Sequence, residues 1–85
     1  MEKQEVGKIT HYFSKIGVAV VQLSGTLKVG ERILIEGSDT GPVEQTVDSM
    51  QIEHKDVPEA GDGQSVGMKV NGKVHPGNTV YTFSD

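Results

Sequence analysis

Eighty-five residues without a cysteine leave room for one domain, and they exclude disulfide bonds and thiolate metal sites. Twelve acidic residues against eight basic ones give a net charge of −4, which disfavours broad electrostatic capture of nucleic acid. Residues 1–5 are polar and open no apolar signal segment, and the longest apolar run, residues 18–21, is too short to span a membrane. We therefore expect a soluble cytoplasmic protein without a membrane partner.

The chain continues as short alternating or β-branched segments separated by glycine-rich turns. Alternation in the first segment predicts that Gly7, Ile9, His11 and Phe13 share one face of a strand. A change of parity near Asp48 predicts a β-bulge in a later strand. The segments that we expect to form strands are residues 6–13, 18–23, 32–36, 43–54, 66–70 and 79–83.

Nothing in the sequence has a sustained helical period, and turn signals recur every 8–12 residues or so. This pattern predicts an all-β fold, a small closed antiparallel β-barrel of about six or seven strands. We expect residues 1–5 to be a flexible N-terminus, residues 6–83 to form the single barrel domain and residues 84–85 to be its C-terminal end.

The string Gly63-Gln64-Ser65-Val66-Gly67 satisfies G-x-S-x-G, the pattern around the nucleophile of many serine hydrolases. In those enzymes the serine lies on a turn between a strand and a helix. Here a turn precedes Ser65 and a strand pattern follows it, so we expect Ser65 to begin a strand and to have no catalytic role.

Other chemistry-bearing patterns are weak. The sequence contains neither G-x-x-x-x-G-K-[ST] nor G-x-G-x-x-G, so no nucleotide-phosphate loop is predicted. His54 and Asp56 are too few ligands for a closed metal site, and we interpret them as solvated loop residues. The four aromatic residues could form a base-stacking platform, but a domain this small needs them for its core. We expect no enzymatic activity, no catalytic residues, no metal and no cofactor.

The order of the motifs resembles the second domain of translational GTPases such as elongation factor Tu. In that family, glycines and small apolar residues recur in a fixed series along the barrel. The segments that carry the resemblance are residues 6–13 (VGKITHYF), 16–21 (IGVAVV), 24–33 (SGTLKVGERI), 47–52 (VDSMQI), 60–67 (AGDGQSVG) and 75–81 (HPGNTVY). The chain is also similar to the C-terminal barrel of collagenase-like peptidases, where the barrel is an accessory without an active site.

The resemblance implies a binding module. In the translation factors this domain contributes to the pocket for the aminoacylated end of tRNA, which implies a translation-factor-like module contacting tRNA or ribosomal RNA. No GTPase domain accompanies the barrel, so we expect no nucleotide hydrolysis. The alternative is an accessory barrel, monomeric in itself, that docks on an enzyme or a translation factor as a protein partner. In both cases the candidate binding residues are Gln51, Glu53, His54, Lys55 and Lys69.

Overall fold

The structure is a computed structural model that describes residues 2–38 and 40–84 of the chain. All regular structure in those residues is β-strand, and they include no helix long and apolar enough to cross a membrane. The ten strands formed by the described residues are β1 (Glu2–Phe13), β2 (Val18–Leu23), β3 (Leu27–Lys28), β4 (Arg32–Gly37), β5 (Thr40–Thr46), β6 (Met50–Ile52), β7 (Lys55–Asp56), β8 (Glu59–Ala60), β9 (Ser65–Lys69) and β10 (Thr79–Ser84).

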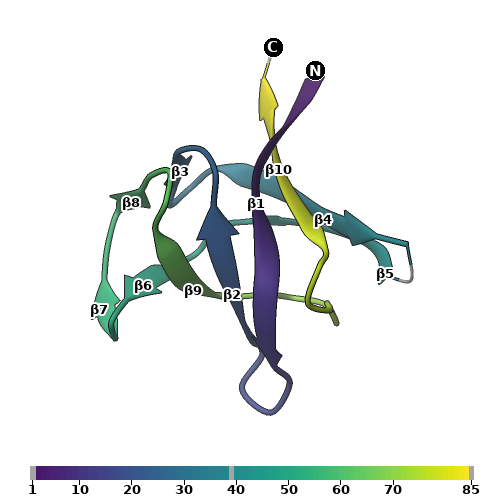
Figure 1. Cartoon of the computed structure of the whole chain (residues 1–85), viewed down its shortest axis with the longest axis horizontal. Helices are drawn as coiled ribbons and strands as arrows, with labels where there is room; N and C mark the ends of the chain where they lie inside the picture. The colour runs from purple at the N-terminus through teal and green to yellow at the C-terminus, as the bar shows by residue number, and fades with distance from the viewer. Residues whose placement is uncertain (1, 39, 85) are drawn as a thin grey trace.

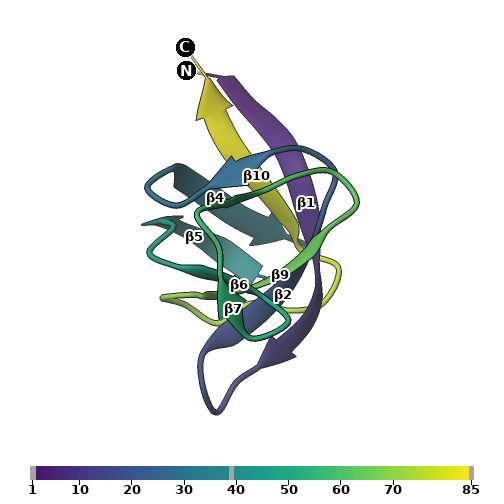
Figure 2. The same cartoon turned by 90° about the vertical axis from the view of Figure 1, so that its left-hand side faces the viewer.

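All paired strands run antiparallel. Eight of them form one sheet in the order β5-β4-β10-β1-β2-β9-β6-β7, and β3 pairs with β8 in a second sheet of the described chain. Figures 1 and 2 show the strands of the large sheet curving round a common interior. The predicted all-β antiparallel barrel is thereby confirmed. The short strands β3, β7 and β8 have two residues each, too few to leave an alternating pattern in the sequence.

The core of the described chain is aliphatic. Its buried hydrophobic residues are Val6, Ile9, Ala19, Val21, Leu23, Leu27, Ile33, Ile35, Val47, Met50, Ala60, Val66, Met68, Val70, Val74 and Val80. Tyr12 packs against this core from a partly buried position, whereas Phe13 is 46% exposed. The expectation that the core needs the aromatic side chains is therefore wrong for Phe13, because aliphatic residues from both halves of the sheet already fill the interior.

Strand β1 is longer and less regular than its sequence pattern predicts. It begins at Glu2 rather than Val6, and residues 2–5 pair with residues 81–84 of β10. Its pairing with β2 shifts register between Ile9 and His11, which is the signature of a β-bulge. The shift reverses which face each following side chain occupies. Ile9 is buried while His11 and Phe13 are exposed, so the predicted shared face is wrong beyond Ile9.

The segment predicted as one bulged strand, residues 43–54, is instead two strands separated by residues 47–49. Val47 leaves β5 and hydrogen-bonds to the turn before β4. Its N–H donates to the Glu31 carbonyl at 2.9 Å, and its carbonyl accepts from the Gly30 N–H at 2.8 Å. The change of parity near Asp48 therefore marks a break in the strand, because the chain moves from one part of the barrel wall to another.

Candidate functional site

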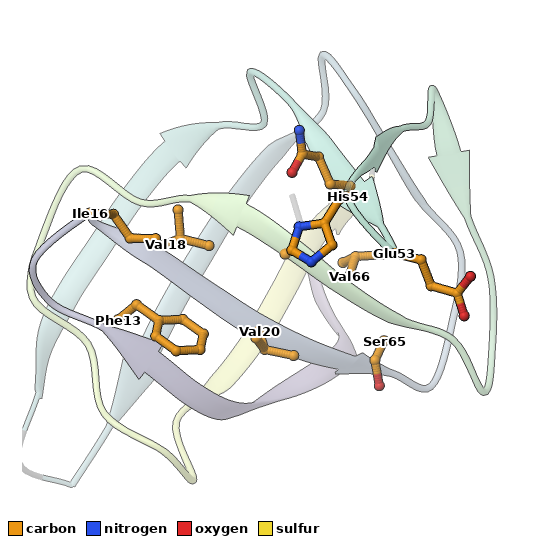
Figure 3. Close-up of a pocket in the computed structure, with 10 residues that line it drawn as sticks. Phe13, Ile16, Val18, Val20, Glu53, His54, Ser65 and Val66 are labelled. Carbon is orange, nitrogen blue, oxygen red and sulfur yellow. The ribbon is translucent and has the colours of Figure 1, made fainter.

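A surface groove of about 470 Å³ lies on the outer face of β2 and β9. We call it the β2–β9 groove. Its lining residues are Phe13, Ile16, Val18, Val20, Gln51, Glu53, His54, Ser65, Val66 and Gly67. Figure 3 shows Phe13, Val18 and Val20 on one side of the groove and His54 on the other, near Val66. The groove is mainly apolar and open to solvent, which suits it to receive a side chain or a short chain segment.

The Glu53-His54 turn forms one end of this groove. Ile52 pairs with Lys55, so these two residues make the two-residue loop of the β6–β7 hairpin. Both are left-handed, with φ of 51° at Glu53 and 66° at His54. Two-residue hairpin loops of this kind favour Asn-Gly, because positive φ costs other L-residues about 1–2 kcal/mol each. The fold thus tolerates a strained backbone at two side chains that line the groove.

Gly67 forms the floor of the groove. A Cβ built at this position would meet only the Val18 Cγ1 atom within 4 Å, at an ordinary contact distance of 3.6 Å. The close approach of a neighbouring backbone therefore does not explain this glycine. A glycine inside a strand also weakens the strand, so its presence needs another explanation. Because Gly67 has no side chain, the groove stays open between Val18 and Val20 on one side and Gln51 on the other.

The structure brings three of the five predicted binding residues together. Gln51, Glu53 and His54 all line the β2–β9 groove. Lys55 pairs with Ile52, which places it on the face of the hairpin opposite to Gln51 and away from the groove. Lys69 pairs with Val18, so it lies on the same outer face as the groove but at its end.

Sequence reasoning missed the apolar wall of the groove. Phe13, Ile16, Val18 and Val20 line it from the β1–β2 hairpin, and Ile16 is 62% exposed. One signal could have found it, because Ile16 lies in a four-residue turn of otherwise polar or small residues, residues 14–17. An exposed aliphatic side chain that lies beside other exposed apolar residues marks a surface that can bind another molecule.

Ser65 begins β9, and a turn at Asp62-Gly63 precedes it, as the sequence predicts. Its hydroxyl donates a 2.7 Å hydrogen bond to the side-chain carbonyl of Gln22 on the neighbouring strand. In serine hydrolases of this pattern, a helix follows the nucleophile, whereas here a strand follows Ser65. The G-x-S-x-G match is therefore a turn leading into a strand.

The His54–Asp56 pair also has a structural explanation. The Asp56 carboxylate accepts a 3.1 Å hydrogen bond from the Gln51 side-chain amide, across the β6–β7 hairpin. Within residues 2–38 and 40–84, no group of three or more His, Cys, Asp or Glu residues is placed to hold a metal ion. Asp56 thus supports the hairpin that presents Gln51 to the groove.

Comparison with known proteins identifies relatives of two kinds. Residues 18–81 match the family model for elongation factor Tu domain 2. An uncharacterized protease of Methanocaldococcus jannaschii is 45% identical over 83 residues, which are 98% of this chain and 20% of the relative. A collagenase of Porphyromonas gingivalis is 39% identical over 83 residues, which are 96% of this chain and 23% of the relative. The chain therefore spans about a fifth of the length of these relatives.

Solved structures agree on the fold. Two crystal structures of the C-terminal domain of a Geobacillus thermoleovorans protein, named as a U32 peptidase, superpose with TM-scores of 0.90 and 0.87. The first covers 95% of this chain and 93% of the other at 20% identity, and the second covers 91% and 96% at 22% identity.

These relatives correct the functional expectation drawn from the translation factors. The relatives with the higher identity are named as a protease and a collagenase, so the prediction of a translation-factor-like module that contacts tRNA or ribosomal RNA is wrong. The fold assignment stands, because the family model covers residues 18–81 of the barrel. The chain belongs to the elongation factor Tu domain 2 family.

Proposed function

We propose that this barrel is a non-catalytic accessory domain that docks on an enzyme of the collagenase-like peptidase type. One observation carries the proposal. Nearly the whole chain, 98% of it, is 45% identical to a protease of which it covers only 20%. The same kind of sequence therefore occurs as a module within a much longer polypeptide, and we assign the peptidase chemistry to the remainder of that polypeptide.

The surface of the barrel supports a docking role. Large apolar side chains exposed close together on a small protein mark sites that bind another molecule. Phe13 and Ile16 are 46% and 62% exposed and line the same groove. The net charge of −4 favours a protein partner over a phosphate backbone, because nucleic-acid binding depends on clustered cations.

Binding to a peptidase relative tests this function directly. The probe is the Methanocaldococcus jannaschii protease from which the matching 83 residues have been removed. Its folding is checked by circular dichroism before use. Isothermal titration with the 85-residue protein should show a one-to-one complex of micromolar affinity. The intact protease should bind more weakly, because its own matching segment competes for the same surface.

Two further arms complete the test. Deacylated tRNA titrated at physiological salt should give no binding. The full-length protease carrying this chain in place of its own segment should unfold in one cooperative transition, because docked domains stabilise each other. Absence of a complex with a folded probe, together with independent unfolding of the barrel in the exchanged protein, would contradict the proposed function.

A further inference from the structure

We propose that the β2–β9 groove receives an extended segment of the protein partner that carries a large apolar side chain beside a basic residue. In this proposal Glu53 and His54 decide which segment is accepted. The inference rests on the proposed function. It adds the docking surface and the chemistry of the occupant, which sequence similarity to peptidases does not supply.

The apolar part of the occupant follows from what the groove exposes. The large hydrophobic side chains exposed on the described surface are Phe13, Ile16 and Val29. Two of these three lie at the β2–β9 groove, where the partly buried Val18 and Val20 extend the apolar wall. Removing such a surface from water is the main favourable contribution to protein association. A large apolar side chain such as Phe, Leu or Met is chemically complementary to this apolar lining.

We infer the basic residue of the occupant from the negative charge of Glu53. Among the described residues that line the groove, Glu53 alone has a formal charge when histidine is neutral. Neither of the ion pairs found within residues 2–38 and 40–84, Lys3–Glu36 and Arg32–Glu44, uses the Glu53 carboxylate. That carboxylate is therefore available to a cation brought by the partner.

Lys69 does not cancel this charge. Gln51 pairs with Gly67 in an antiparallel register, so the chain beyond Ile52 runs toward the Ser65 end of β9. Lys69 is at the opposite end of that strand. Four residues at about 3.3 Å each separate Ser65 from Lys69 by about 13 Å, which exceeds the Debye length of about 8 Å at physiological salt. The Glu53 carboxylate is therefore far from Lys69, and Lys55 lies on the opposite face of the hairpin, away from the groove.

The strained Glu53-His54 turn supports a binding role for this end of the groove independently of the charge argument. Glu53 and His54 both adopt positive φ in a hairpin loop where Asn-Gly would form with less strain. Strain of this kind is characteristic of positions whose side chains are needed for binding. Both side chains line the groove.

Nuclear magnetic resonance of the 15N-labelled protein tests the occupant. The probes are two acetylated, amidated peptides of sequence GSFRSG and GSFESG, which differ only in the charge beside the phenylalanine. We expect both to shift the amide signals of residues 13–20, 51–54 and 65–67. The arginine peptide should bind about 2- to 5-fold more tightly, the effect of one exposed ion pair. Glu53→Gln should remove that preference without weakening the glutamate peptide.

Three variants separate binding from folding. Gly67→Val should fill the floor and weaken both peptides about tenfold or more, the effect of losing a central contact. Glu53→Asn combined with His54→Gly should abolish the charge preference in a protein that melts at a higher temperature than wild type. Val29→Ser is the matched control. Val29 is 41% exposed and lines a separate groove of about 390 Å³ with Met50, Val57 and Pro58, so its replacement should leave peptide binding unchanged.

Several results would overturn the proposal. Absence of shifts at millimolar peptide, shifts centred on Val29, or equal affinity for the two peptides would each do so. Concentration-dependent dimerisation lost in Ile16→Ser would show that a second copy occupies the groove instead. If the peptidase probe binds while the peptides do not, the groove is the wrong surface and the proposed function stands. If the peptides bind and the peptidase probe does not, the proposed function fails.

Discussion

The side-chain amide of Gln45 donates a 2.9 Å hydrogen bond to the backbone carbonyl of Lys69. The side-chain carbonyl of the same residue accepts a 2.7 Å bond from the Asn71 N–H. Gln45 belongs to β5 at one edge of the sheet, and Lys69 ends β9 near the other edge. One buried polar side chain, 2% exposed, thus joins two parts of the barrel wall that no strand ladder connects directly.

Replacing Gln45 with leucine should destabilise the barrel. The substitution leaves the Lys69 carbonyl and the Asn71 N–H without their partner, and an unsatisfied buried polar group costs about 1–3 kcal/mol. We expect the free energy of unfolding to fall by about 2–4 kcal/mol, measured by urea denaturation. Gln4→Leu is the control, since Gln4 is exposed and should change stability by less than about 0.5 kcal/mol. Equal stability of the two variants would show that the Gln45 bonds do not hold the wall together.

Two glycines in the strands on either side of β2, one in β1 and one in β9, should respond oppositely to alanine. A Cβ at Gly7 would lie 2.7 Å from the Gln22 carbonyl oxygen and 2.8 Å from Val21 Cγ1, so Gly7→Ala forces the backbone apart. We expect a loss of about 1–3 kcal/mol in the free energy of unfolding. A Cβ at Gly67 meets only ordinary contacts, and Gly67→Ala should gain about 0.5 kcal/mol. Thermal melts of the two variants provide the comparison, and a destabilised Gly67→Ala protein would contradict our account of the groove floor.

Replacing Glu53-His54 with Asn-Gly should stabilise the protein. Asn-Gly at these positions relieves strain at both left-handed residues, so the double variant should gain about 1–2 kcal/mol in the free energy of unfolding. The midpoint of urea denaturation measures this gain. A loss of stability would mean that the native side chains contribute to the fold itself, which would remove the reason to connect the turn with binding.

The N-terminal part of β1 should show a pH-dependent stability. A hydrogen bond to the Glu36 carboxylate, aided by the negative charge of that carboxylate, raises the pKa of Lys3 above its ordinary value of 10.5. The folded protein therefore holds this proton more tightly than the unfolded chain. The stabilisation is complete below pH 10.5 and is lost as the pH rises through the higher folded-state pKa.

The comparison of wild type with Lys3→Met measures this contribution. The difference between their urea midpoints should be constant at neutral pH and should shrink above pH 10.5. High salt should reduce it as well, because the ammonium and the Glu36 carboxylate are exposed. A difference that grows with pH would contradict this assignment.

Local pattern sufficed to predict β2, β4, β9 and β10 and the turn before Ser65. The β-branched run in residues 18–23 forms β2, and the turn before Ser65 leads into β9 as predicted. The bulge between Ile9 and His11 escaped prediction, because the partner strand rather than the local sequence decides where a residue is left unpaired. Residues 70–78, which connect β9 to β10, contain Asn71-Gly72 but form no tight hairpin, and Gly72 lies close to Val43 of β5.

Three of the ten lining residues of the candidate site were predicted from the sequence. Resemblance to the translation factors led to Gln51, Glu53 and His54, and their common groove is a property of one short hairpin. The opposite wall comes from Phe13 and Ile16, more than 30 residues earlier in the chain. Only the β2–β9–β6 order of the folded sheet brings these segments to one face. The identity of the partner could not follow from resemblance in fold, because folds host many unrelated functions.

The most direct test of the central claim is a chemical-shift map of the labelled protein bound to the truncated peptidase relative. The account predicts that amide signals of residues 13–20, 51–54 and 65–67 shift or broaden, while those around Val29 do not. Signals that remain unchanged across the β2–β9 groove, with a footprint elsewhere on the barrel or none at all, would contradict it.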